Sequence, residues 1–204
     1  MKNKIVRRYI KNPILTPADI PYDVVTVHNA GVVKHGNKYI MLFRSHLKNG
    51  RSIIGIAESE NGYDFKVRPE PFMTPSNNGI FKEYEEFGVE DCRISKIENE
   101  YYITYSAYSR YGVRIGLAKT KDFESVERIA FISQSDMRNV VIFPEKINNL
   151  YVRLDRPHTE IMPWSIWISY SPDLIYWGNS KVIIKPLPYH WDEMKIGPGA
   201  TPIK

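Results

Sequence analysis

Apolar and polar residues alternate along many short segments of this chain, which is the pattern expected of half-buried β-strands. Three such segments carry Asn at their first position and Tyr at their third: NKYIMLFR (37–44), NEYYITYS (99–106) and NLYVRLDR (149–156). A second set, in which each segment begins with Ile, follows in step at 54–65, 115–126 and 166–177. Because the two sets recur together, the chain is predicted to repeat one structural unit.

Each unit is predicted to contain four antiparallel strands. An alternating segment precedes each Asn–Tyr strand, at 28–35, 90–97 and 139–147, and the dipeptides Gly-Asn, Glu-Asn and Asn-Asn supply tight turns between the two strands. Polar turn residues after the Ile strands lead into a fourth, outer strand. Four-stranded units of this kind indicate an all-β protein with the blades of a β-propeller, and no segment keeps a helical period.

The last residues, KIGPGATPIK (195–204), are predicted to be another inner strand, because Lys204 aligns with Lys34, Lys96 and Lys146. Residues 1–204 are therefore interpreted as one incomplete propeller domain of about three and a half blades. Such a ring cannot close, and it would leave an unpaired sheet edge and uncovered apolar faces. We therefore expect this sequence to be part of a longer protein.

The composition narrows the function classes. The net charge is +5, but Lys and Arg are dispersed, so no nucleic-acid partner is expected. The basic start of the chain lacks the apolar stretch of a signal peptide, and no segment approaches the ~20 apolar residues that cross a membrane. The only cysteine is Cys92, which favours a cytoplasmic location. The five histidines lack metal-ligand spacing, so no metal is expected. Aromatic residues make up 13%, which is compatible with sugar binding.

Several motifs together resemble glycoside hydrolase family 130, the β-mannoside phosphorylases and related β-mannosidases. They are NPIL (12–15), HNAGVVKHGNKYIMLFR (28–44), GVEDCRI (88–94), YYITYSAYS (101–109), LAKTKDF (117–123), FPEKINNLYVRLDRP (143–157), WISYSPDLIYW (167–177) and KIGPGATPI (195–203). The resemblance covers almost the whole chain in the family's order. It implies a five-bladed propeller with a central pocket, truncated here, and inverting phosphorolysis of β-mannosides to mannose 1-phosphate. The implied partners are a β-mannoside oligosaccharide and inorganic phosphate as co-substrate, without another cofactor, and a homo-oligomer is compatible with it.

The resemblance also implies roles for single residues. Asp91 matches the general acid, whose proton passes through a sugar hydroxyl. The candidates for phosphate binding are Arg44, Arg51, Arg138 and Lys195. The candidates for sugar binding are Asn29, Glu90, Tyr105, Asp155 and Arg156.

The residues alone leave other readings of these positions open. Asp91 and Arg93 are compatible with an ion pair at the start of a strand, and Asp155 and Arg156 with a pair of their own. Arg44 would then be an arginine that extends along apolar surface to solvent. The chain also departs from the family's phosphorylases: Cys92 replaces Pro, HNAG (28–31) replaces a Phe-Asn-Pro-Gly type motif, Arg138 and Asn139 replace Lys-Asp, and Asp155 replaces His.

Two other functions remain open at this stage. An inverting hydrolase needs a second carboxylate to activate water, whereas a phosphorylase needs an acid and cations that hold phosphate. The alternatives to a phosphorylase are therefore a β-mannosidase of the same family and a non-catalytic carbohydrate-binding fragment.

Overall fold

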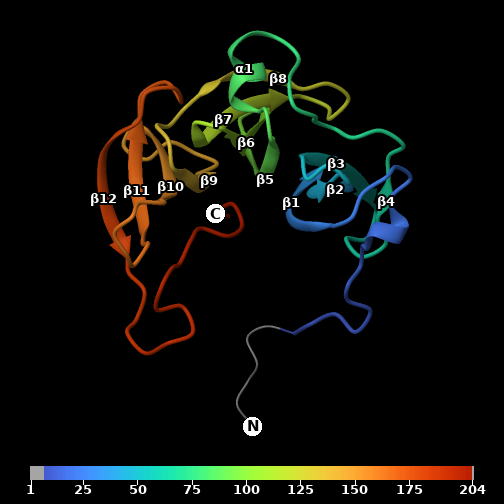
Figure 1. The fold of residues 1–204 in the computed structure, drawn as a ribbon, viewed down its shortest axis with the longest axis horizontal. Helices are drawn as coiled ribbons and strands as arrows, with labels where there is room; N and C mark the ends of the chain where they lie inside the picture. The colour runs from blue at the N-terminus through green and yellow to red at the C-terminus, as the bar shows by residue number, and fades with distance from the viewer. Residues whose placement is uncertain (1–6, 204) are drawn as a thin grey trace.

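The computed structural model describes residues 7–203, in which three four-stranded blades fan around a common axis (Figure 1). A parallel pairing of Ser52 with Gly88 joins the first two blades into one eight-stranded sheet, and the third blade is a separate four-stranded sheet. The first blade contains β1 (His28–His35), β2 (Lys38–His46), β3 (Ser52–Ser59) and β4 (Lys66–Val67). The second contains β5 (Gly88–Ile97), β6 (Glu100–Ser109), β7 (Gly112–Thr120) and β8 (Glu127–Phe131). The third contains β9 (Met137–Ile142), β10 (Tyr151–Pro157), β11 (Ile166–Ser171) and β12 (Gly178–Ile184). The predicted all-β, truncated propeller is confirmed.

Helices contribute little to this fold. A 3-10 helix covers Pro17–Asp19, and α1 (Gly79–Tyr84) lies in the connection between the first two blades. Within residues 7–203, no helix is long and apolar enough to cross a membrane.

The predicted fourth inner strand is wrong. Apart from one isolated bridge between Lys195 and Trp164, residues 195–203 form no ladder. Pro198 and Pro202 have no backbone N–H, so the segment cannot pair as a regular strand. It runs instead toward the centre of the fan (Figure 1), where Thr201 Oγ1 donates to the Ile94 carbonyl at 2.8 Å. The predicted alignment of Lys204 lies outside the described residues.

The three inner strands share an irregularity near the axis. The pairing register shifts between His28 and Gly31 in β1 and between Glu90 and Arg93 in β5, and a matching shift occurs where β9 pairs with β10. One residue in each bulge has a left-handed backbone: Asn29 (φ 51°), Asp91 (φ 50°) and Asn139 (φ 55°). Asn and Asp tolerate this conformation better than other side chains. In each blade, the bulge therefore turns the side chain of one Asn or Asp away from the direction that a regular strand would give it.

The turn after each third strand also repeats. A hydroxyl accepts backbone N–H bonds there, and a residue three positions later has positive φ. The hydroxyls belong to Ser59, Thr120 and Ser171, and the positive-φ residues are Gly62, Phe123 and Leu174. These turns confirm the repeat expected from the sequence.

Apolar side chains fill the spaces between the blades. One cluster joins the first two blades and includes Leu42, Ile54 and Ile103. A second joins blades two and three and includes Leu117 and Ile142. These contacts fix the angle between blades, and so they determine which inner-strand side chains meet at the axis.

Candidate active site

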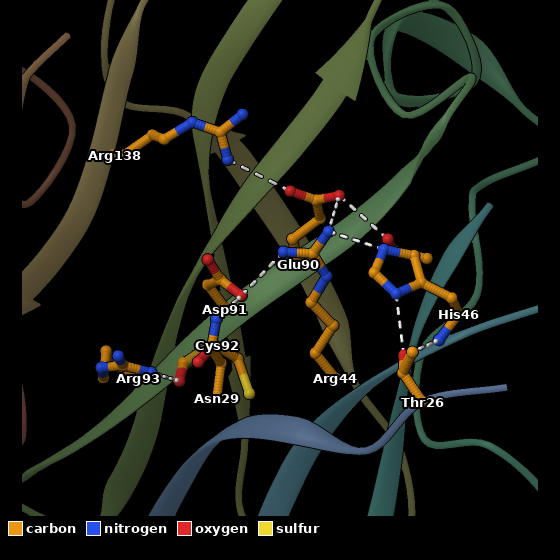
Figure 2. A network of polar contacts seen from close by, with 10 residues as sticks. Thr26, Asn29, Arg44, His46, Glu90, Asp91, Cys92, Arg93 and Arg138 are labelled. Atoms are coloured by element: carbon orange, nitrogen blue, oxygen red, sulfur yellow. Dashed lines mark hydrogen bonds and ion pairs between the residues drawn. The ribbon is translucent and has the colours of Figure 1, made fainter. Parts of the chain in front are cut away.

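Glu90 is the hub of the polar network at the axis (Figure 2). Its Oε1 accepts from Arg44 Nη2 at 2.7 Å and from Ser52 Oγ at 2.9 Å, and its Oε2 accepts from Arg138 Nη1 at 3.2 Å. The side chain is only 4% exposed. Because the carboxylate oxygens of this second-blade residue accept bonds from the first and third blades, Glu90 links all three blades. This differs from its predicted contact with sugar.

Asp91 is held beside Glu90 with one oxygen left over. Its Oδ1 accepts from Asn29 Nδ2 at 2.8 Å and from Arg44 Nη1 at 3.2 Å (Figure 2). No bond to Oδ2 occurs within residues 7–203, and the side chain is 12% exposed. Asp91 is therefore oriented through Oδ1, while Oδ2 remains available to exchange a proton with a ligand.

The alternative of an Asp91–Arg93 ion pair is wrong. Arg93 Nε donates to the Gly199 carbonyl at 2.7 Å, and its Nη1 donates to the Cys92 carbonyl at 2.9 Å. The left-handed backbone of Asp91 turns its side chain toward Asn29 and Arg44 instead. Arg93 serves to hold the C-terminal segment against β5.

Arg44 lies between the two carboxylates rather than free at the axis. Besides its bonds to Glu90 and Asp91, its Nη2 contacts His46 Nε2 at 2.8 Å. The alternative in which Arg44 extends along apolar surface to solvent is therefore wrong, since its guanidinium lies in a largely buried ion-pair network. Its contacts make Arg44 a residue that orients Asp91, while its Nε has no hydrogen-bond partner among residues 7–203.

Cations gather on the third-blade side of the network. Arg138 carries one contact to Glu90, and Arg156, on the neighbouring strand, pairs with Arg138 in register. Arg156 forms no hydrogen bond or ion pair with other described residues, although its Nε is buried. The Arg156 Cζ lies 5.8 Å from the centre of the Trp164 ring, and the Lys195 Nζ lies 5.9 Å from the same ring centre.

The electrostatics of this side match an anion site. Burial lowers the pKa of Arg156, as does the charge of Arg138, while the charge of Asp91 opposes both. Burial likewise lowers the pKa of His158, and Arg138 and Arg156 lower it further. A buried guanidinium without a partner is costly. An anion bound beside Arg138 and Arg156 would relieve that cost.

Two predicted sugar-binding residues lie away from the axis. Tyr105 is 1% exposed and donates its hydroxyl to Glu85 Oε1 at 2.7 Å inside the second blade. Asp155 is also 1% exposed, and its Oδ2 accepts from Arg153 Nε and from Ser169 Oγ, each at 2.8 Å. Side chains alternate along a strand, so Asp155 shares a face with Arg153 and not with Arg156. The structure therefore buries Tyr105 and Asp155 within their blades, and the Asp155–Arg156 pair is wrong because Asp155 pairs with Arg153.

The structure places the other two predicted phosphate ligands at the edge of the site. Arg51 is exposed in the turn between β2 and β3. Its charge lowers the pKa of Glu86, after the larger effect of a hydrogen bond from Arg110. Lys195 is exposed beside Trp164. Only Lys195 shares an environment with the cations of the third blade.

The sequence analysis missed three residues of this region. Asn139 occupies the same bulge position as Asn29 and Asp91, so aligning the inner strands would have found it. His46 and His158 each follow an axial arginine by two positions, which places them on the same face of the strand. No group of three or more His, Cys, Asp or Glu side chains able to hold a metal ion occurs within residues 7–203.

Comparisons with known proteins agree with this geometry. The model of glycoside hydrolase family 130, described as beta-1,4-mannooligosaccharide phosphorylase, matches residues 3–204. A beta-1,2-mannobiose phosphorylase of Listeria innocua is 30% identical, and the match covers 98% of this chain and 71% of the relative. A 1,2-beta-oligomannan phosphorylase of Thermoanaerobacter sp. is 31% identical over 98% of this chain and 68% of its own length. The solved structure of the Listeria enzyme with beta-1,2-mannobiose superposes with a TM-score of 0.87 at 29% identity, covering 97% of this chain and 71% of that one.

Proposed function

This chain belongs to glycoside hydrolase family 130, and we propose that it cleaves β-mannosides with inorganic phosphate and inverts the anomeric centre, giving α-mannose 1-phosphate. One observation carries the proposal. Asp91, with a free Oδ2, shares one network with Arg138, and its charge acts on the unpartnered Arg156. An acid and a pair of guanidinium groups are the two elements that phosphorolysis requires.

In the proposed reaction, protonated Asp91 Oδ2 supplies the proton that the leaving oxygen takes up, relayed through a sugar hydroxyl. A phosphate oxygen attacks C1 from the opposite face as the bond between C1 and the leaving oxygen breaks. The products are α-mannose 1-phosphate and the saccharide shortened by one mannose, and the proton of the incoming phosphate restores Asp91. Arg138 and Arg156 hold the phosphate, since a guanidinium fork matches two phosphate oxygens. Asn29 and Arg44 keep Asp91 in place through Oδ1.

The network favours phosphate over water as the attacking group. Hydrolysis with inversion needs a carboxylate base on the face opposite the acid. Glu90 is the carboxylate beside Asp91, but both of its oxygens accept bonds from Arg44, Ser52 and Arg138. With both oxygens engaged in this way, Glu90 presents no open oxygen to a water molecule at the site. Phosphate needs no such base, because it is already an anion.

The test compares consumption of β-1,2- and β-1,4-linked mannobiose with and without phosphate, for the wild type and Asp91→Asn. Asparagine keeps the Oδ1 acceptor but cannot donate an acid proton, so turnover should fall by at least about a hundredfold. Turnover in the wild type should require phosphate. Release of free mannose at the same rate without phosphate would instead establish the β-mannosidase alternative. Mannobiose binding without turnover in both proteins would establish a carbohydrate-binding role.

A further inference from the structure

His46 lies directly behind the arginine that orients the acid. It follows Arg44 by two positions in β2, so both side chains point to the same face of the strand. Its Nε2 is 2.8 Å from Arg44 Nη2, and its Nδ1 is 2.8 Å from Thr26 Oγ1 (Figure 2). His46 therefore bridges Arg44 to the segment that precedes β1.

The chemistry of these contacts determines which nitrogen of the His46 ring carries the proton. A guanidinium has only donors, so His46 Nε2 must accept from Arg44 and cannot carry a proton. The ring proton is then on Nδ1, where it donates to Thr26 Oγ1. The same Thr26 oxygen accepts from the His46 backbone N–H at 3.1 Å. These two bonds select the neutral Nδ1–H tautomer.

The surroundings of the His46 ring shift its pKa in opposite directions. Burial lowers the pKa of His46, and the charge of Arg44 lowers it further, while Glu90 and Asp91 raise it by less. The His28 ring lies 5.2 Å away, centre to centre, and burial lowers its pKa as well. The neutral ring therefore predominates at neutral pH, because the pKa of His46 lies below the ordinary value of a histidine.

We propose that neutral His46 is a positioning residue for Arg44, and that its protonation releases Arg44 and so disables the acid site. A proton on Nε2 would face the Arg44 Nη2 donor, and two donors cannot bond to each other. Arg44 Nη2 would then turn away from His46. Because the guanidinium is planar, this turn would also move Nη1, which donates to Asp91 Oδ1 at 3.2 Å, and the orientation of Asp91 by Arg44 would be lost. The catalytic consequence rests on the proposed phosphorolysis, whereas the tautomer does not.

The kinetic test measures kcat/KM for mannobiose between about pH 5 and 8 in matched variants, around the ordinary histidine pKa. His46→Gln keeps an acceptor for Arg44 but cannot titrate, so it should retain activity at neutral pH and lose the acid decline of the wild type. His46→Leu removes the acceptor and should lose about tenfold or more at every pH, since a hydrogen bond to a charged group is lost. His190→Gln, at an exposed site, should follow the wild type. An acid decline that persists unchanged in His46→Gln would overturn the proposal.

A second test does not depend on activity or on the leucine variant folding. Nitrogen NMR of the histidine rings identifies His46 by the signal missing in His46→Gln. The Nδ1–H tautomer is expected, with a pKa below the ordinary histidine value. A wild-type ring that is Nε2–H or charged at neutral pH would contradict the proposal. If no mannoside turns over under any condition, the proposed function fails, and the ring spectrum still decides the tautomer.

Discussion

Single residues at the axis have roles that depend on backbone geometry as much as on side-chain type. Asn29, Asp91 and Asn139 occupy equivalent bulges with positive φ. The sequence analysis found Asn29 and Asp91 through motif resemblance, because both belong to quoted motifs. Asn139 was named only because it and its neighbour Arg138 depart from the family's pattern, and it was not among the candidate site residues. The physical signal was present, since an Asn or Asp before an alternating strand favours the left-handed conformation that a bulge requires.

This geometry predicts the effect of changes at Asn139. Asn139→Ala should lower the free energy of unfolding by about 1–2 kcal/mol, because alanine is strained in the left-handed region. Asn139→Gly should cost less than the alanine variant, since glycine adopts positive φ freely. Urea unfolding of both variants checks the order. A glycine variant less stable than the alanine variant would show that side-chain contacts, and not backbone strain, dominate at this bulge.

Arg156 is the residue whose change should separate phosphate binding from sugar binding. Because its guanidinium has no partner among residues 7–203, Arg156→Gln leaves no carboxylate bare, and stability should change by less than about 1 kcal/mol. The KM for phosphate should rise by about tenfold or more, since a charged hydrogen-bonding group is removed. The KM for mannobiose should change much less.

The matched control for Arg156 is Lys181→Gln, which removes an exposed cation on the outer strand β12. It should leave both KM values unchanged. An equal rise in the KM values for phosphate and mannobiose in Arg156→Gln would contradict the assignment to phosphate.

At the level of the strand, one repeated position explains why Tyr105 and Asp155 are buried within their blades. Phe43, Tyr105 and Asp155 are equivalent members of the second strand of each blade. In the first two blades the aromatic ring covers a glycine of the next strand: Phe43 pairs with Gly55 and Tyr105 with Gly116. In the third blade Asp155 pairs with Trp167 at the same place. This position faces the blade interior, so the side chains of Tyr105 and Asp155 lie away from the axis.

This packing predicts a cost for filling the glycine position. Gly116→Ala would place its Cβ against the Tyr105 ring, which Glu85 holds through its hydroxyl, and should lower the free energy of unfolding by about 1–3 kcal/mol. Gly178→Ala is the matched control, because an added Cβ at Gly178 meets nothing within 4 Å. Thermal unfolding of the two variants gives the comparison. Equal stability of both alanine variants would show that the Tyr105 ring moves aside easily.

The repeat located the strands of all three blades, but it also predicted a further strand at 195–203 that does not form. Apolar alternation, turn dipeptides and common spacing located the strands of all three blades, because these signals are local. The segment 195–203 shares the Lys and apolar residues of an inner strand, yet its prolines and its contacts with Arg93 and Ile94 hold it as an irregular segment. Those contacts come from a distant part of the chain, and no local pattern reveals them.

At the scale of the whole molecule, the blades divide the work of the site. The first blade supplies Asn29 and Arg44, which bond to Asp91 of the second blade, and the third supplies Arg138, which bonds to Glu90. In the proposed reaction Asp91 is the acid, and Arg138 and Arg156 hold the phosphate. The family resemblance implied a central pocket and named candidate charged residues from distant segments. It could not predict which charges would neutralise one another, because that depends on the angle between blades set by the buried clusters.

The central claim is that the axis joins an acid from one blade to phosphate-binding cations from another. Phosphorus NMR of the protein with β-mannobiose and inorganic phosphate tests it most directly, because it reports both the bond formed and the anomeric configuration. The account predicts that the phosphate signal declines as that of α-mannose 1-phosphate grows, one for each mannoside consumed. Mannoside consumption with an unchanged phosphate signal, or formation of the β-anomer, would contradict it.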